Sequence, residues 1–305
     1  MIDQRHRDEW RASGIDDAII DLNLQSLSGY APHNRLLYSP KIRRLNTGRI
    51  DSEMLRQYAH VEKGGWWGNG LDPLDDWQLM EWGCFKPDCP RINKKGKLVK
   101  YEHPPKTEAC AFFLRVSLKA WEAIAARYNV SMPEVQISSN GEAIGFWAWV
   151  LQNNIPIVVT EGIKKAAALL SNGFAAIALP GIWNGRRVLN DGTGILIPEL
   201  ELFATKDRII YFAFDSDEKP KTVTDVKNAI TRTGKLFIAA ECRVNVISWD
   251  SALGKGVDDF IAANGGAAFE QVYSSALSLQ QWQWHSRPER KLSYVPSVSL
   301  NVGDL

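Results

Sequence analysis

The order of apolar and polar positions along the chain changes near residue 150. From about residue 151, short apolar runs alternate with segments whose apolar residues recur at helical spacing. The apolar runs predict strands over 155–160, 174–181, 207–214 and 243–249, and the segments between them predict helices over 162–173, within 195–206, over 225–241 and over 257–266. Strands that alternate with helices predict a parallel sheet with right-handed crossover connections.

Residues 1–150 lack this alternation and predict a separate α+β domain. Residues 5–27 predict helix and loop, residues 64–77 predict a loop rich in glycine and tryptophan, and residues 111–129 run from a strand-like start into an amphipathic helix. The expected fold class is therefore α/β, with a parallel sheet flanked by helices at 151–283 after the α+β domain at 1–150. Residues 284–305 predict a linker or tail.

Composition limits the classes of partner. The chain has 305 residues, of which 45% are hydrophobic, and a formal net charge of +1, so any attraction to a polyanion must be local. The opening residues carry charges where a signal peptide needs an apolar stretch, and no window is long and apolar enough to span a membrane. Four irregularly spaced cysteines fit reduced thiols. We expect a cytoplasmic protein without a membrane partner.

Acidic side chains follow three of the predicted strands. Glu161 ends the first strand, Asp215 and Asp217 follow the third, and Asp258 and Asp259 follow the fourth. The carboxyl ends of parallel strands meet at one edge of a sheet, where clustered carboxylates repel one another unless a cation neutralises them. Mg²⁺ or Mn²⁺ is the expected ion, because it takes carboxylate oxygens as ligands. The alternative is that each acid only caps a helix or shapes a turn.

Several short segments of the sequence resemble those of a known family. "EG" at 161–162, "DSD" at 215–217 and "GVDDF" at 256–260 resemble the Toprim domain of bacterial replicative primases, topoisomerases and certain nucleases. Residues 82–115 are similar to the primase segment that precedes that domain, with Lys86, Lys100 and Arg115 at its basic positions. The whole chain also resembles a Toprim-like family of cyanobacterial plasmid replication proteins, through "SLSGYAP", "GGWW", "KYEHPP", "EGIKKA" and "KGVDDF".

The resemblance implies a magnesium-dependent nucleic-acid enzyme of DNA replication, most simply the core of a primase-like nucleotidyltransferase. Asp215 and Asp217 would hold the ion, Asp258 would complete its shell, and Glu161 would be general base or a further ligand. The implied partners are single-stranded DNA, nucleoside triphosphates and a helicase domain or partner. Two alternatives stay open: a Toprim nuclease, such as a plasmid replication initiator that cuts DNA, and a catalytically silent DNA-binding module.

Two positions depart from the primase pattern. Lys165 stands where primases carry an acid four residues after the glutamate, and Gly256 stands at the first acidic position of the last motif. A smaller set of acids fits one magnesium ion better than two or three, and both departures favour the silent alternative. Lys165 itself is either part of a solvated helix face or a phosphate contact.

Positive charge is concentrated just before the acidic sheet. Residues 82–106 contain seven basic and two acidic side chains, a net charge of +5. Such a segment can neutralise the phosphates of a nucleic acid without reading its sequence. The candidate contacts to nucleic acid or nucleotide are Lys86, Arg91, Lys94, Lys95, Lys97, Lys100, Arg115 and Lys165. The alternative is an ordinary exposed hairpin that turns at 93–97.

Overall fold

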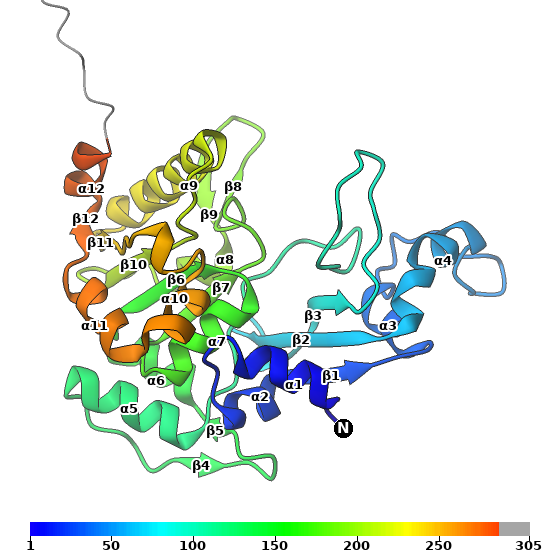
Figure 1. Ribbon diagram of the computed structural model, residues 1–305, viewed down its shortest axis with the longest axis horizontal. Coiled ribbons are helices and arrows are strands. Elements are labelled where there is room, and N and C mark those ends of the chain that lie inside the picture. The colour runs from blue at the N-terminus through cyan, green and yellow to red at the C-terminus, as the bar shows by residue number, and fades with distance from the viewer. Residues whose placement is uncertain (287–305) are drawn as a thin grey trace, which may run out of the picture.

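A computed structural model describes residues 1–286 of the chain. Its C-terminal half is built on a five-stranded sheet with the strand order β12–β11–β10–β6–β7 (Figure 1). The strands are β6 (Ile157–Glu161), β7 (Ala176–Leu179), β10 (Ile209–Ala213), β11 (Arg243–Val246) and β12 (Leu277–Ser278). The first four run parallel, which confirms the sequence prediction. The short antiparallel edge strand β12 was not predicted.

Helices follow the strands, the first four in the predicted order and the last two beyond those that the sequence predicts. They are α7 (Ile163–Ser171), α8 (Pro198–Glu201), α9 (Pro220–Ala239), α10 (Val257–Asn264), α11 (Gly266–Ser274) and α12 (Leu279–His285), with a 3₁₀ turn η2 (Ser251–Leu253) before α10. Gly265 closes α10, as the sequence indicates. The predicted tail was placed to begin at residue 284, but α12 continues to His285. The rest of that tail, residues 287–305, lies outside the described residues.

The centre of the sheet is a topological switch point. β6 and β10 are neighbours, with Thr160 paired to Ala213, and the chain leaves them in opposite directions toward β7 and β11. Right-handed crossovers then place α7 and α9 on opposite faces of the sheet, and the loops after β6 and β10 separate around a crevice. The end of β6 and the loop after β10 therefore border the same crevice.

The N-terminal half contains an antiparallel sheet of β1 (Leu24–Leu27), β2 (Gly65–Asp72) and β3 (Gln78–Pro87). Its helical elements are α1 (Gln4–Arg11), α2 (Asp17–Asn23), α3 (Ala31–Leu36), α4 (Ser52–Tyr58) and the 3₁₀ helix η1 (Ala59–Lys63). The prediction that residues 64–77 form a loop was wrong, because most of them form β2. The glycines there permit close packing: a Cβ on Gly70 would lie 2.8 Å from the backbone nitrogen of Phe113.

The two halves share one hydrophobic core. The buried apolar cluster runs from Trp10 in α1 to Leu279 in α12. The middle of the chain forms α5 (Leu118–Tyr128), the hairpin of β4 (Gln136–Ile137) with β5 (Ala143–Ile144), and α6 (Phe146–Gln152). A second hairpin, of β8 (Arg186–Val188) with β9 (Gly194–Leu196), follows β7 within the C-terminal half. The predicted helix within 111–129 is confirmed as α5, whereas its strand-like start forms only isolated bridges, one to β2 and one to β7. The predicted boundary at residue 150 falls inside α6. No helix within residues 1–286 is long and apolar enough to cross a membrane.

Arg208 joins α6 to the start of the central strands. Its side chain is fully buried just before β10. The guanidinium donates to the backbone carbonyls of Val150 (3.1 Å), Leu151 (2.9 Å) and Ile155 (2.8 Å). Burial lowers the pKa of Arg208 to about 10. Buried carbonyls that lose a donor cost stability, so this residue fixes where the central strands begin.

Replacing Arg208 tests this attachment. We expect Arg208→Met to lower the free energy of unfolding by about 3 kcal/mol or more, because three carbonyls lose their donor. The control is Arg243→Met, which removes an exposed arginine paired with Asp207 and is expected to change stability by less than about 0.5 kcal/mol. Urea unfolding of the three proteins measures both effects. Equal losses in the two variants would contradict the role assigned to Arg208.

Candidate active site at the carboxyl edge of the sheet

The four predicted carboxylates all lie at the carboxyl edge of the sheet. Glu161 is the last residue of β6, Asp215 and Asp217 stand in the loop after β10, and Asp258 is the second residue of α10. Asp258 is only 6% exposed. The structure gathers Glu161, Asp215 and Asp258 around the side chain of Lys165, whereas Asp217 has a different cationic partner. Three of the four predicted acids thus form one cluster.

Lys165 reaches this cluster from the first turn of α7. Its side chain is 18% exposed, and its Nζ lies 2.9 Å from Oδ1 of Asp215. Burial by itself lowers the pKa of Lys165, but the carboxylates of Asp215, Asp258 and Glu161 outweigh it and raise the pKa above its usual value. The ammonium is therefore held in its charged form among carboxylates, and the solvated helix face considered from sequence does not describe this side chain.

Glu161 and Asp258 are the two carboxyl groups of the cluster whose charged form is disfavoured by their surroundings. Burial raises the pKa of each carboxyl above its ordinary value, and the positive charge of Lys165 opposes that rise without cancelling it. A nearby carboxylate adds to the rise in each case: Asp215 for Glu161, and Asp259 for Asp258. Asp259 itself accepts a hydrogen bond from the backbone nitrogen of Gly256 at 3.1 Å and so caps α10.

Asp217 fits the alternative interpretation of "DSD", in which the acid shapes a polar turn and does not bind a metal ion. Its Oδ1 accepts a hydrogen bond from the backbone nitrogen of Lys219 at 2.8 Å, and its Oδ2 lies 3.0 Å from Nζ of Lys255. The hydrogen bond from Lys219 and the charge of Lys255 lower the pKa of Asp217. Asp217 therefore shapes the turn that leads into α9.

The donor set does not fit the expected metal in this arrangement. Within residues 1–286, no three or more histidine, cysteine, aspartate or glutamate side chains are placed to hold one metal ion. An ammonium stands among the carboxylates instead, and it repels a divalent cation. The Mg²⁺ or Mn²⁺ site expected from sequence is therefore not formed by these side chains as they lie.

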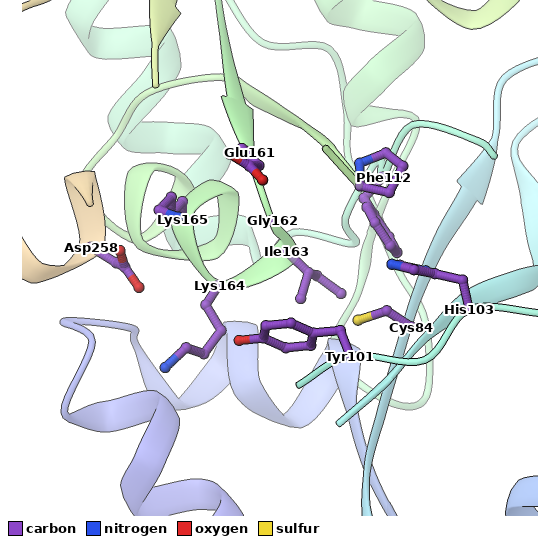
Figure 2. A pocket seen from close by; sticks show the side chains of 11 residues that line it. Cys84, Tyr101, His103, Phe112, Glu161, Gly162, Ile163, Lys164, Lys165 and Asp258 are labelled. Atoms are coloured by element: carbon purple, nitrogen blue, oxygen red, sulfur yellow. The ribbon is translucent and has the colours of Figure 1, made fainter. Parts of the chain in front are cut away.

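A cavity of about 120 Å³ adjoins the cluster. Figure 2 shows Glu161, Lys165 and Asp258 on one side of it and the side chains of Cys84, Tyr101, His103 and Phe112 on the other. The ring of His103 stacks on that of Trp82, with centroids 4.9 Å apart. Of this wall, the sequence indicates only Tyr101, an aromatic side chain beside the basic positions on which a base could stack. The phrase "KYEHPP" contains Tyr101 and His103 and was its one visible signal, whereas Cys84 and Phe112 look like ordinary core residues.

The basic residues predicted to contact nucleic acid separate into two groups. Some are committed to internal contacts: Lys86 lies 2.8 Å from Glu9, and Arg91 binds both oxygens of Glu102 at 2.6 and 3.0 Å. Arg115 is largely buried and lines a different cavity, so it is not brought to the acidic cluster. The others are exposed and, within residues 1–286, form no side-chain ion pair: Lys94, Lys95, Lys97 and Lys100.

The exposed lysines belong to an arm that projects from the molecule. An antiparallel bridge between Ile92 and Leu98 closes the arm, and the turn at 93–97 forms its tip. In Figure 1 the arm is the long teal loop that follows β3. Ile92 and Leu98 are also exposed, at 68% and 53%. We call residues 91–100 the basic arm. Its turn is the hairpin that the sequence indicates, and its charges are open to a ligand.

The burial of Glu161 predicts a pH dependence. Because its pKa is raised in the folded state, the folded protein keeps a proton that the unfolded chain has released, and stability falls as pH rises from 4.5 through the raised pKa. We expect Glu161→Gln to be more stable than the wild type above this interval and equally stable below it. Urea unfolding between about pH 4 and about pH 8 measures the difference. Glu134→Gln, at an exposed position, is the control and is expected to show none. A Glu161→Gln variant that is less stable at neutral pH would contradict this assignment.

Sequence comparisons give one family and one long relative. The family described as "Domain of unknown function (DUF3854)" matches residues 146–268. An uncharacterised protein of Picosynechococcus sp. (strain ATCC 27264 / PCC 7002 / PR-6) is 43% identical over 295 residues, which cover 93% of this chain and 28% of that protein. The chain therefore spans less than a third of the length of this curated relative.

Two solved structures show the same architecture. The Aquifex aeolicus primase, with its zinc-binding and RNA polymerase domains, aligns at a TM-score of 0.52 and 14% identity over 93% of this chain and 59% of that chain. The E. coli primase catalytic core aligns at a TM-score of 0.51 and 13% identity over 92% of this chain and 75% of that chain. Identity this low is informative about fold alone. The expected α/β class is confirmed, and the chain shares the fold of bacterial primase catalytic cores.

Proposed function

We propose that this chain is a primase-like nucleic-acid enzyme that binds single-stranded DNA and joins nucleotides at the acidic edge of its sheet. The observation that carries this proposal is the combination, on a primase-core fold, of the half-buried carboxylate of Glu161 at the switch point with an adjoining cavity walled by aromatic rings. Carboxyl ends of strands at a switch point are where α/β folds bind and convert ligands. Aromatic rings offer surfaces on which a base can stack.

Glu161 is the residue proposed to move the proton. When a hydroxyl attacks the α-phosphorus of a nucleoside triphosphate, the new oxygen–phosphorus bond forms, the bond to pyrophosphate breaks, and the hydroxyl proton must be accepted. A carboxylate whose pKa is raised toward neutrality accepts a proton better than an ordinary one. A triphosphate arrives as its complex with Mg²⁺ or Mn²⁺, so in this proposal the ion belongs to the substrate.

The basic arm is proposed to hold the DNA strand. Its four exposed lysines can neutralise phosphates, and Tyr101, which follows the arm and is 40% exposed, reaches the cavity beside the cluster. Phosphate contacts position a strand without reading its sequence. A helicase domain or partner would supply the single strand.

A catalytically silent DNA-binding module is the second candidate. The ion pair between Lys165 and Asp215 favours it, because an enzyme that needed a metal ion in the cluster would keep the carboxylates available. The nuclease alternative would use the same edge to activate water, and it leaves a different product.

One assay separates these functions. The chain is incubated with labelled nucleoside triphosphates, Mg²⁺ or Mn²⁺, and either single-stranded or supercoiled DNA. Labelled oligonucleotides that grow on the single strand, and that disappear with Glu161→Gln, support the proposal. Nicked DNA without synthesis would replace it with the nuclease function. If the chain binds the DNA but neither synthesises nor cuts a strand, the catalytically silent module is the function that remains.

The basic arm makes a separate prediction. We expect the triple variant of Lys94, Lys95 and Lys97 to alanine to weaken binding of single-stranded DNA of every sequence. The slope of log affinity against log salt should become shallower by about 0.7 for each phosphate that the variant no longer neutralises. The control removes the same charge from exposed lysines of the other half, Lys206, Lys221 and Lys235. Fluorescence anisotropy over a series of salt concentrations measures both. Equal weakening by the two triple variants would show only an effect of net charge.

A further inference from the structure

The two departures from the primase sequence pattern meet in space. Lys165 lies in α7 and Gly256 is the N-cap residue just before α10, ninety-one positions apart by their residue numbers. A Cβ built on Gly256 would lie 2.5 Å from Cε of Lys165, 2.5 Å from Oδ1 of Asp258 and 3.4 Å from Oδ1 of Asp215. The lysine stem therefore occupies space that any side chain at position 256 would need.

Gly256 is not required for its backbone conformation. Its φ is −93° and its ψ is 163°, an extended conformation that every L-residue adopts easily. What matters at this position is the absence of a Cβ, which leaves room for the side chains of Lys165 and Asp258. A lysine at 165 and a glycine at 256 thus form one coupled arrangement: the second residue makes room for the first.

The cluster needs a positive charge. Asp258 is 6% exposed, its Oδ1 is buried, and this atom accepts no hydrogen bond within the described part of the chain. Asp215 has Lys165 as its ion-pair partner at 2.9 Å, and the charge of the same ammonium opposes the rise in the pKa of Glu161. Buried carboxylates that lose their cation are strongly destabilising. Among the residues that the structure describes, Lys165 is the cation in closest contact with this cluster.

We propose that Lys165 is the resident cation of the acidic cluster: its ammonium takes the place of a divalent ion among Glu161, Asp215 and Asp258. While the lysine is in place, the folded protein holds no divalent ion there. In a chain with a neutral residue at 165 the three carboxylates lose their ammonium, and their side chains then have to move together to bind a divalent ion in its place. This inference concerns charge balance in the folded protein, so it stands or falls independently of whether the chain synthesises, cuts or only binds nucleic acid.

Thermal unfolding with and without Mn²⁺ tests the proposal, and the protein needs no nucleic acid for it. The wild-type melting temperature is expected to be the same in chelator and in excess Mn²⁺. Lys165→Met keeps most of the apolar stem and removes the charge, so it should melt several degrees lower in chelator and recover as Mn²⁺ binds the folded state. Lys164→Met is the matched control. The adjacent lysine is paired with Glu9 (3.2 Å) and donates to Ser13 (2.9 Å), and it forms no ion pair with the three carboxylates, although its charge opposes the rise in the pKa of Asp258. Its loss should therefore create no response to Mn²⁺.

Direct Mn²⁺ binding to the wild type keeps the proposal testable even if Lys165→Met does not fold. The electron paramagnetic resonance signal of free Mn²⁺ should be unchanged by the wild-type chain. A wild-type site that is lost in both Glu161→Gln and Asp258→Asn would overturn the proposal, because a divalent ion would then coexist with the lysine. A folded Lys165→Met protein that neither loses stability nor binds Mn²⁺ would also overturn it, since the cluster would then need no cation.

Discussion

The ion pair between Lys165 and Asp215 is the interaction on which the candidate site depends. The topology brings β6 and β10 side by side and ends both strands in acidic residues, so carboxylates converge whatever the reaction is. Asp258 adds a third from α10. A cation has to be present for these groups to be buried together, and α7 supplies it from the turn that follows Glu161. The chain itself thus supplies a positive charge to the acidic crevice of a primase-like fold.

A second group of ion pairs joins the N-terminal half to the helix that carries Lys165. Glu9 in α1 lies 2.8 Å from Lys86 on β3 and 3.2 Å from Lys164 on α7, so one carboxylate connects the N-terminal sheet to a helix of the C-terminal half. Close packing supports this contact: a Cβ on Gly68 of β2 would lie 2.5 Å from Cδ1 of Ile163. The aromatic wall of the cavity is therefore held against the carboxyl edge of the sheet.

Local patterns predicted the sheet but not its long-range contacts. The run "IVVT" of β6 is buried on both faces and looks like a central parallel strand in sequence alone. The glycines of β2 look like loop residues, because the backbone of Phe113 that they approach lies far away in the sequence. The convergence of acids followed from strand order. The role of Lys165 did not, since it depends on Gly256, and charge counting could not show that Glu102 binds Arg91 while Lys94 stays exposed.

The most direct measurement of the central claim is anomalous diffraction from crystals of the wild-type protein soaked in MnCl₂. The account predicts density for the Lys165 side chain between Asp215 and Asp258, with its Nζ paired to Asp215, and no manganese peak among the three carboxylates. A manganese peak coordinated by Glu161, Asp215 and Asp258, with the lysine turned away from the cluster, would contradict it.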